Sequence, residues 1–581
     1  MAIPRLRKRN TSEEATPRFF DRHLAIFAFV VLAGIIAAYV PALQAGFIWD
    51  DDDHFTHNPY VTEPGGLVTI WTTTKAIYYP LTLTTWWVMR RLFDLNPFPY
   101  HLITVVLHAA NAILFAGLLR RLAIPGAFLA GAIFAFHPMQ VESVAWATEL
   151  KNTQSGLFFL LAILAFLRAD DALRAGSRWW PTWLLSMLMG VAAILSKPST
   201  VPLPGVLLVL LIWLRGSWDW KLVARVAPLV VLALLSSLWT IYEQKHHSNA
   251  KGPEWDYGFV ERLVIAGRAF WFYVGKFLWP EPLIFIYPRW EPATGPAVLH
   301  IGWVLAVAGP LALSVAALRG IVWARASLAL WLLYGGLLFP VLGFFNIYFN
   351  RFSFVADHFA YLALMIPSIA AGLVVAKGIE LLDPELRRVG WAIAFAIPVV
   401  LGAMSWRQTP IYKNEEVLWR DTLALNPNAW IGENNLGFEL TQQGRFEESL
   451  AHFRRALELK PDYEEAHNNL GFALLELGRP AEAIAPLRRA VELRQPFANA
   501  MMNLANALAG TGELDEAASL YTSVVQLMPN DAAVHANHGS ILAMKERFAE
   551  AREALRRAAQ LDPSNAEVTQ RLAFVESRLK P

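Results

Sequence analysis

The feature that most constrains this chain is a series of long apolar runs within its first 408 residues. A run of about 20 apolar residues can cross the hydrocarbon core of a bilayer, and shorter runs can be tilted or packed inside a bundle. Because 55% of all residues are hydrophobic and only 17% are charged, we expect a polytopic membrane helix bundle of about 11 spans. The runs cover residues 24–46, 101–119, 124–146, 154–167, 179–195, 201–214, 226–242, 298–318, 326–345, 359–377 and 389–406.

Charge and cysteine content exclude several classes of protein. Fifty basic residues against 48 acidic ones give a net charge of +2, which does not fit a nucleic-acid-binding surface as the main function. The chain has no cysteine, so disulfides, thiolate nucleophiles and cysteine-ligated metals are excluded. We therefore expect no nucleic-acid partner, and the compartment must be inferred from the membrane topology.

Basic residues set the predicted orientation, because Lys and Arg accumulate in cytoplasmic loops. With the basic segment 1–23 inside, every short basic loop also falls inside. Residues 259–279 are apolar but carry four charges, and counting them as a span would invert all later loops. We interpret them as interfacial or re-entrant. The membrane domain is then 24–408, with large external loops at 47–99 and 243–297.

From residue 409 the pattern changes to helical repeats with a period of 34 residues. Leu436-Gly437 recurs as Leu470-Gly471, and Gly444, Gly478 and Gly512 mark turns between helices. Such a period with small residues at fixed positions is typical of tetratricopeptide repeats. We expect 409–581 to form an α-solenoid of four full repeats and a half repeat, outside the cytoplasm. The whole chain is therefore predicted to be all-α.

Four consecutive aspartates, Asp50 to Asp53, follow the first apolar run. Adjacent carboxylates repel one another and raise each other's pKa unless cations or hydrogen-bond donors compensate. One interpretation is a solvated acidic turn. Another is a site for Mg²⁺ or Mn²⁺ on Asp52 and Asp53, since these ions prefer oxygen ligands; such a metal is possible here but not required.

Cationic residues are predicted on the same external side as the aspartates. Ionisable residues near membrane depth are candidates for function, although each alone could be a side chain that snorkels to the interface. Together they suggest a site for an anionic lipid head group, where a carboxylate takes a proton from an acceptor hydroxyl and the cations neutralise a departing phosphate. These residues are His137, Lys151, Lys197, Arg289, Arg351 and His358.

An ordered set of motifs then resembles one family. The set is Trp49-Asp50-Asp51, Asn58-Pro59, Tyr79-Pro80-Leu81-Thr82, Asn96-Pro97-Phe98, Leu107-His108-Ala109-Ala110-Asn111, His137-Pro138 and Glu142-Ser143-Val144-Ala145-Trp146, followed by Ser196-Lys197-Pro198, Tyr287-Pro288 and the segment Asp357 to Tyr361. It is similar to the transmembrane and tetratricopeptide repeat-containing (TMTC) protein O-mannosyltransferases and their bacterial relatives, of the glycosyltransferase-C superfamily.

The resemblance implies an inverting membrane glycosyltransferase that takes a sugar from a polyprenyl-phosphate donor, with Asp50 or Asp51 as catalytic base. Two positions depart from the family. Tyr79 stands where the family has Arg, and Leu150-Lys151-Asn152 replaces Arg-Lys-Asp. The first change removes an expected phosphate ligand, whereas Lys151 remains to bind the donor.

The first helices of the repeats carry asparagine at one shared position: Asn435, Asn469, Asn503 and Asn537. First helices line the concave face of a tetratricopeptide superhelix, and an amide can donate to and accept from a peptide backbone. This Asn ladder resembles that of the nucleocytoplasmic O-linked N-acetylglucosamine transferase and suggests a polypeptide acceptor. The alternative is that the asparagines only bond one repeat to the next.

The function expected from these observations is transfer of a sugar to Ser or Thr hydroxyls of extracytoplasmic proteins that the repeats bind. Two alternatives remain open: a glycosyltransferase acting on a lipid or cell-envelope glycan, and a non-enzymatic membrane-anchored repeat scaffold. The Ala- and Arg-rich composition suggests a bacterial inner membrane, with the active site and repeats in the periplasm.

Overall fold

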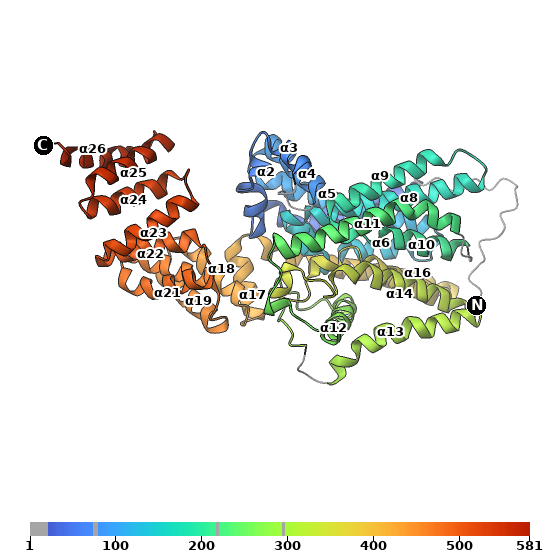
Figure 1. Ribbon diagram of the computed structural model, residues 1–581. Helices are drawn as coiled ribbons and strands as arrows, with labels where there is room; N and C mark the ends of the chain where they lie inside the picture. The colour runs from blue at the N-terminus through green and yellow to red at the C-terminus, as the bar shows by residue number, and fades with distance from the viewer. Residues whose placement is uncertain (1–20, 74–78, 216–219, 293–296, 581) are drawn as a thin grey trace. The chain divides into compact units, whose positions relative to one another are not determined.

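In a computed structural model, described for residues 21–73, 79–215, 220–292 and 297–580, the chain is helical and contains no β-strand within these ranges. It divides into two compact units, Met1–Leu418 and Trp419–Pro581, which run from blue to yellow and from orange to red in Figure 1. The prediction of an all-α chain with a helix bundle followed by repeats is confirmed.

The first unit is a bundle of long helices. Its helices are α1 (Arg22–Tyr39), α2 (Pro59–Thr62), α3 (Gly66–Thr72), α4 (Pro80–Phe93), α5 (Pro97–Arg121), α6 (Ala127–Phe136), α7 (Val141–Ala145), α8 (Leu150–Arg174), α9 (Trp180–Ser196), α10 (Leu203–Arg215), α11 (Trp220–His246), α12 (Phe259–Leu278), α13 (Ala297–Leu318), α14 (Val322–Leu338), α15 (Met365–Glu380) and α16 (Pro384–Gln408). The next helix, α17 (Glu415–Leu425), contains the division between the two units.

Seven helices in the described part of the chain are long and apolar enough to cross a membrane: α1, α5, α10, α11, α13, α14 and α16. The chain is therefore a multi-pass membrane protein. The other four predicted runs lie in α6, α8, α9 and α15, which are shorter or carry more polar residues. Helix α12 covers residues 259–278 and is not among the seven in the described chain; Figure 1 views it nearly along its axis, whereas α13 and α14 are seen from the side.

Ion pairs bring the basic ends of several helices to one end of the bundle. Asp21 accepts a hydrogen bond from the backbone N–H of Leu24 and so begins α1, while it also pairs with Arg120 at the end of α5. The end of α8 joins the same group through three further pairs, Arg121–Asp171, Arg215–Asp170 and Arg225–Asp170. The geometry agrees with the predicted alternation of the spans; which end faces the cytoplasm stays a prediction.

The loop 47–99 is folded rather than extended. Helices α2, α3 and α4 enclose an apolar cluster that includes Phe55, Trp86 and Tyr100. The Asn-Pro motifs explain how two helices begin, because Asn58 caps α2 and Asn96 caps α5 while the following proline takes the first helical position, a preferred combination.

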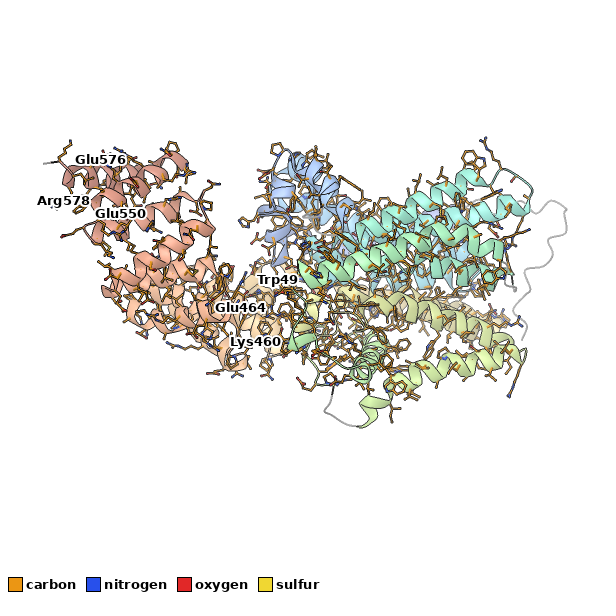
Figure 2. The ribbon with its side chains drawn as sticks, viewed as in Figure 1. Trp49, Lys460, Glu464, Glu550, Glu576 and Arg578 are labelled. Carbon is orange, nitrogen blue, oxygen red and sulfur yellow. The ribbon has the colours of Figure 1, made fainter. Side chains whose placement is uncertain are left out.

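The second unit is a stack of helix pairs with one final helix: α18 (Trp430–Gln442), α19 (Phe446–Leu459), α20 (Glu464–Glu476), α21 (Pro480–Leu493), α22 (Ala498–Thr511), α23 (Leu514–Leu527), α24 (Ala532–Met544), α25 (Phe548–Leu561) and α26 (Ala566–Arg578). Figure 2 shows Glu550, Glu576 and Arg578 toward its C-terminal end.

The small residue of the Leu-Gly motif lets the two helices of a repeat approach closely. A Cβ atom on Gly471 would lie 2.3 Å from the side chain of Leu487 on the second helix, so a larger residue would push the pair apart. The turn after the first helix needs a left-handed residue, with φ of 74°, 71° and 90° at the three glycines noted above. In the fourth repeat Glu546 adopts φ 60° at the equivalent position.

The two units meet ten residues later than the predicted boundary of 408/409, since the division falls after Leu418. Residues just past α16 belong to the first unit because they hold the turn that follows α1. The carbonyl of Lys413 accepts from the backbone N–H of Gly46 at 3.0 Å, and Glu415 accepts from that of Trp49 at 3.1 Å.

Candidate active site

Asp51 is a buried carboxylate whose hydrogen bonds fix the turn after α1. Its Oδ2 accepts from the backbone N–H of Ile48 at 2.9 Å. Its Oδ1 accepts from both the backbone N–H and the hydroxyl of Thr148, at 2.7 and 2.5 Å. Both oxygens are thus occupied by fixed donors, so Asp51 ties the turn after α1 to the 3-10 turn Ala147–Glu149.

Asp50, the preceding residue, is half-buried. Its carboxylate accepts no hydrogen bond from any residue that the structure describes. The residue before it, Trp49, has φ 46°, a left-handed conformation that is rare for a bulky side chain. Trp49 is held there by stacking on Trp146, with ring centroids 5.6 Å apart and planes 10° apart. The turn at Trp49 therefore points two adjacent carboxylates into different surroundings.

The surroundings of Asp50 contain charges of both signs. The pKa of Asp50 is raised to about 6: burial, Asp53 and Glu149 raise it, whereas Lys151 and His358 lower it. A carboxylate with a pKa near neutrality and an available lone pair has the properties of a general base.

Lys151 and Lys197 share one buried carboxylate, Glu149. Their Nζ atoms each lie 3.0 Å from a different oxygen of that carboxylate. Burial lowers the pKa of Lys197 to about 8, and Glu149 partly offsets this shift. The pKa of Glu149 is lowered overall, because the two lysines outweigh the effect of burial. The two ammonium groups lie side by side and could both interact with a phosphate group.

Amide and histidine groups complete this cluster. Asn152 accepts from Lys197 at 2.7 Å and donates to the backbone carbonyl of His358 at 2.9 Å. His358 in turn bonds Glu142 through both its backbone N–H and its ring Nδ1, at 2.8 and 2.9 Å. The segment 357–361 is thereby attached to the same cluster as the two lysines.

Tyr79 occupies the position where the family has Arg, and it bonds His54. The Nδ1 of His54 lies 2.7 Å from the backbone carbonyl of Asp50 and so donates to it, which leaves Nε2 to accept from the Tyr79 hydroxyl. Burial lowers the pKa of His54 to about 3, so the ring is neutral. This pair supports the backbone of Asp50, and the Lys151 ammonium lies 5.8 Å from the Tyr79 ring.

Three of the residues predicted to bind the donor have polar contacts with residues outside the lysine cluster. His137 is buried, accepts from the backbone N–H of Met139 at 3.3 Å and donates to the carbonyl of Phe277 at 3.0 Å. Arg289 donates to the carbonyls of Asn350 and Glu254. Arg351 pairs with the Glu254 carboxylate at 3.4 Å. Asp50, Lys151, Lys197 and His358 thus interact within one cluster, whereas these polar contacts of His137, Arg289 and Arg351 are with other residues.

Asp52 and Asp53 are exposed, and Asp52 accepts from Thr56 at 3.1 Å. Among the residues that the structure describes, no three His, Asp or Glu side chains come close enough together to hold a metal ion.

The Asn ladder participates in hydrogen bonds between repeats. Asn503 donates to Asn468, Asn468 to Asn469, Asn469 to Asn434 and Asn434 to Asn435, over distances of 2.9 to 3.2 Å. Asn537, in the fourth repeat, contacts Tyr521 instead. Each chained amide keeps part of its bonding capacity, because it has two N–H groups and two acceptor positions, and the four ladder residues stay half-buried.

Two residues of the cluster, Glu149 and Thr148, were not identified from the sequence. Glu149 stands two residues before Lys151, after the largely apolar segment 144–148, and an acidic residue in that position was the available signal. Thr148 carried no signal, because its role depends on meeting Asp51 across 97 positions of the chain.

Comparisons with known proteins agree with both units. A family model described as TPR repeat matches residues 437–478. A second model, described as tetratricopeptide repeat, matches residues 473–532 and 502–566. The human protein O-mannosyl-transferase TMTC2 is 31% identical over 180 residues, which is 29% of this chain and 21% of the human protein. The Drosophila melanogaster protein O-mannosyl-transferase Tmtc3 is 23% identical over 546 residues, 78% of this chain and 57% of that protein.

Solved structures of tetratricopeptide repeat proteins are also similar to this chain. YrrB, described as a TPR protein with an unusual peptide-binding site, is 23% identical and has a TM-score of 0.25, with 34% of this chain and 96% of YrrB covered. The fold and the cluster define a multi-pass membrane protein with tetratricopeptide repeats. Its predicted resemblance to the TMTC family is confirmed, although the matches span less than two thirds of the length of these relatives.

Proposed function

We propose that the chain is an inverting membrane glycosyltransferase that uses a polyprenyl-phosphate sugar and glycosylates Ser or Thr hydroxyls of protein acceptors. The observation that carries the proposal is the unequal environment of the aspartate pair, because Asp50 keeps an available carboxylate beside the lysine pair while Asp51 is saturated. The names of the relatives make mannose the first sugar to test.

In the proposed reaction, Asp50 accepts the proton of the acceptor hydroxyl as that oxygen attacks the anomeric carbon of the donor sugar. The bond between this carbon and the phosphate oxygen breaks, and its electron pair leaves with the polyprenyl phosphate. Lys151 and Lys197 neutralise the negative charge of the released phosphate. Attack opposite to the leaving phosphate inverts the anomeric centre.

We propose that the first helices of the repeats bind the acceptor polypeptide through the remaining hydrogen-bonding capacity of the Asn ladder. The inter-repeat bonds of Asn469 and Asn503 are those of the alternative interpretation, so acceptor binding would use only the capacity that these bonds leave. Replacing Asn435, Asn469, Asn503 and Asn537 together by alanine should raise the KM for a protein acceptor more than it lowers kcat. An unchanged KM would contradict acceptor binding.

The active site and the repeats are proposed to lie on the periplasmic side of a bacterial inner membrane. Support comes from the gathering of basic helix ends at the opposite end of the bundle from Lys151, which lies at the start of α8. Labelling that found the residues 47–99 in the cytoplasm would refute this orientation.

The test of the central proposal compares neighbouring carboxylates. Asp50→Asn should abolish transfer from polyprenyl-phosphate mannose without lowering the thermal midpoint, whereas Asp51→Asn should lower the midpoint because it places an N–H group against fixed donors. Asp53→Asn makes the same change at an exposed carboxylate and should retain transfer; loss there would favour the metal alternative.

The same assay separates the remaining alternatives. Mass spectrometry of glycopeptides that disappear with Asp50→Asn would support a protein acceptor, whereas loss of a modified lipid or envelope glycan would support the second hypothesis. Full retention of every product would leave the chain as a scaffold and overturn the assignment of Asp50.

A further inference from the structure

The backbone directly before Asp50 is bonded to a distant part of the chain. Glu415, the first residue of α17, accepts a hydrogen bond from the backbone N–H of Trp49 through its Oε1 at 3.1 Å, across 366 positions of the sequence. Close by, the carbonyl of Lys413 accepts from the backbone N–H of Gly46 at 3.0 Å. Figure 2 labels Trp49 close to the place where Figure 1 shows α17. The turn after α1 is therefore joined by two hydrogen bonds to the segment that begins α17.

The start of α17 is itself held by contacts on both sides. The Oδ1 of Asn414 accepts from the backbone N–H of Val417 at 3.0 Å, which is the usual bond of a residue that caps a helix N-terminus. Tyr412 is buried, and its ring centroid lies 6.0 Å from that of Phe285. The ring of Phe285 in turn lies 5.2 Å from that of Trp49. The side chain at the first position of α17 is thus presented from a well-packed support.

The conformation of Trp49 sets the direction in which the next side chain, that of Asp50, leaves the backbone. Trp49 has φ 46°, and such a conformation of a bulky residue persists only where its surroundings hold it. On the other side, the carbonyl of Asp50 accepts from His54 Nδ1 at 2.7 Å. The backbone of Asp50 is therefore held before the residue by Glu415 and after it by His54.

Glu415 holds a different part of the turn from Asp51. The carboxylate of Asp51 accepts from the backbone N–H groups of Ile48 and Thr148, and so holds the two ends of the turn. The N–H of Trp49, in the peptide group directly before the base, donates to Glu415. A general base must lie within hydrogen-bond distance of the proton that it removes, and small displacements of reacting groups lower the rate strongly. Control of this peptide group therefore bears on the rate of transfer.

We propose that Glu415 is a positioning residue for Asp50: by accepting the Trp49 N–H it keeps the Asp50 carboxylate directed at the acceptor hydroxyl. This inference rests on the proposed function, because the role exists only if Asp50 is the base. It requires an acceptor oxygen at position 415 and not a negative charge, since a neutral amide oxygen also accepts from an N–H group. Because α17 contains the division between the two units, the segment that leads into the repeats then takes part in the proposed catalysis.

Two variants of the full chain test the acceptor at position 415. Glu415→Met removes the acceptor at a similar side-chain length and should lower kcat about 10- to 100-fold, since a displacement of about 1 Å can cost about 100-fold. The KM for polyprenyl-phosphate mannose should stay within about twofold, because the lysines proposed to bind the donor are unchanged. Glu415→Gln keeps an acceptor oxygen and should retain at least about half of the wild-type kcat, with the acidic limb of the pH profile in place.

Glu261→Met is the matched control. The Oε2 of Glu261 accepts from the backbone N–H of Gly258 at 2.7 Å at the start of α12, so this variant loses the same kind of bond elsewhere and should keep the wild-type kcat. All rates are measured below the thermal midpoint of each variant, so that unfolded protein does not contribute to the loss. An unchanged kcat in Glu415→Met, or an equal loss in Glu261→Met, would overturn the positioning role.

Equal losses in Glu415→Gln and Glu415→Met would also overturn it, because they would assign the effect to the charge. The failure of the proposed function is distinguishable from these outcomes. Transfer retained in Asp50→Asn would remove the base itself. Transfer abolished in Asp50→Asn but unchanged in Glu415→Met would remove only the role of Glu415.

Discussion

Glu149→Gln should shift both limbs of the pH profile of transfer toward lower pH. In the wild type, kcat/KM should rise through about pH 6 as Asp50 loses its proton and fall above about pH 8 as Lys197 loses its charge. One unit below the first value, only about a tenth of Asp50 is in the basic form, so the rate should be about a tenth of its plateau.

The direction of the shift in the pH profile follows from the negative charge of Glu149, which acts both on Asp50, the proposed base, and on Lys197. Its negative charge raises the pKa of Asp50, so removing that charge lets Asp50 ionise at lower pH and moves the acidic limb down. The same charge, 3.0 Å from the Lys197 ammonium, raises the pKa of Lys197. A partner at this distance typically changes a pKa by about 1 to 3 units, so the alkaline limb should fall to about pH 7 or below.

The assay measures initial rates at donor concentrations below KM, from about pH 4 to about pH 10, with each protein first checked for an unchanged thermal midpoint. Asp53→Asn is the control. Asp53 raises the pKa of Asp50 but pairs with neither lysine in the described structure, so only the acidic limb should move. Limbs that stay in place in Glu149→Gln, or move in opposite directions, would refute the assignment of base and phosphate-binding lysine.

Three further changes test the supporting structure. Thr148→Val removes one donor to the buried Asp51 and should cost about 2 kcal/mol, measured as a lower thermal midpoint, whereas Thr56→Val at an exposed site should change it little. Asn468→Met removes two hydrogen bonds of the amide chain and should lower the stability by about 1 kcal/mol for each bond. Amide hydrogen exchange in α20 and α22 should become faster, and unchanged exchange would contradict the prediction. Glu546→Gly removes a non-glycine residue from a left-handed conformation and should stabilise the fourth repeat by about 1 kcal/mol. Amide hydrogen exchange in α24 and α25 should then be slower, and unchanged exchange would argue against strain at this turn.

The helices and repeats could be predicted because they are periodic in the sequence. Apolar runs of span length and a 34-residue period depend on local pattern alone, and they located the helices of both units. The side of the bundle shared by Asp50, Lys151 and Lys197 also followed from counting spans. What could not be predicted was any contact between distant segments, such as Thr148 with Asp51 or Lys413 with Gly46. The boundary after Leu418 depends on such contacts.

The periodic asparagines show the same limit at smaller scale. Their shared position was evident, but their partners Asn434 and Asn468 lie one residue earlier and lack counterparts in the later repeats, where Met502 and Ala536 stand. The amide chain therefore stops in the third repeat, and the two ends of the ladder differ in what their side chains already bond. A peptide bound along it would meet amides that are fixed in the first repeats and less constrained in the last.

The two aspartates, Asp50 and Asp51, depend on each other through the turn at Trp49. A left-handed backbone at Trp49 costs roughly 1 to 2 kcal/mol, and a hydrogen bond to a charged group contributes about 1.5 to 3 kcal/mol. The three bonds that Asp51 accepts, together with the stacking of Trp49 on Trp146, are sufficient to hold this turn. Because the turn separates the directions of the two side chains, saturation of Asp51 is the condition that leaves Asp50 available. With a single aspartate at this turn, the chain would have either the carboxylate that fixes the turn, as Asp51 does, or the carboxylate that can act as a base, as proposed for Asp50. The proposed chemistry requires both carboxylates.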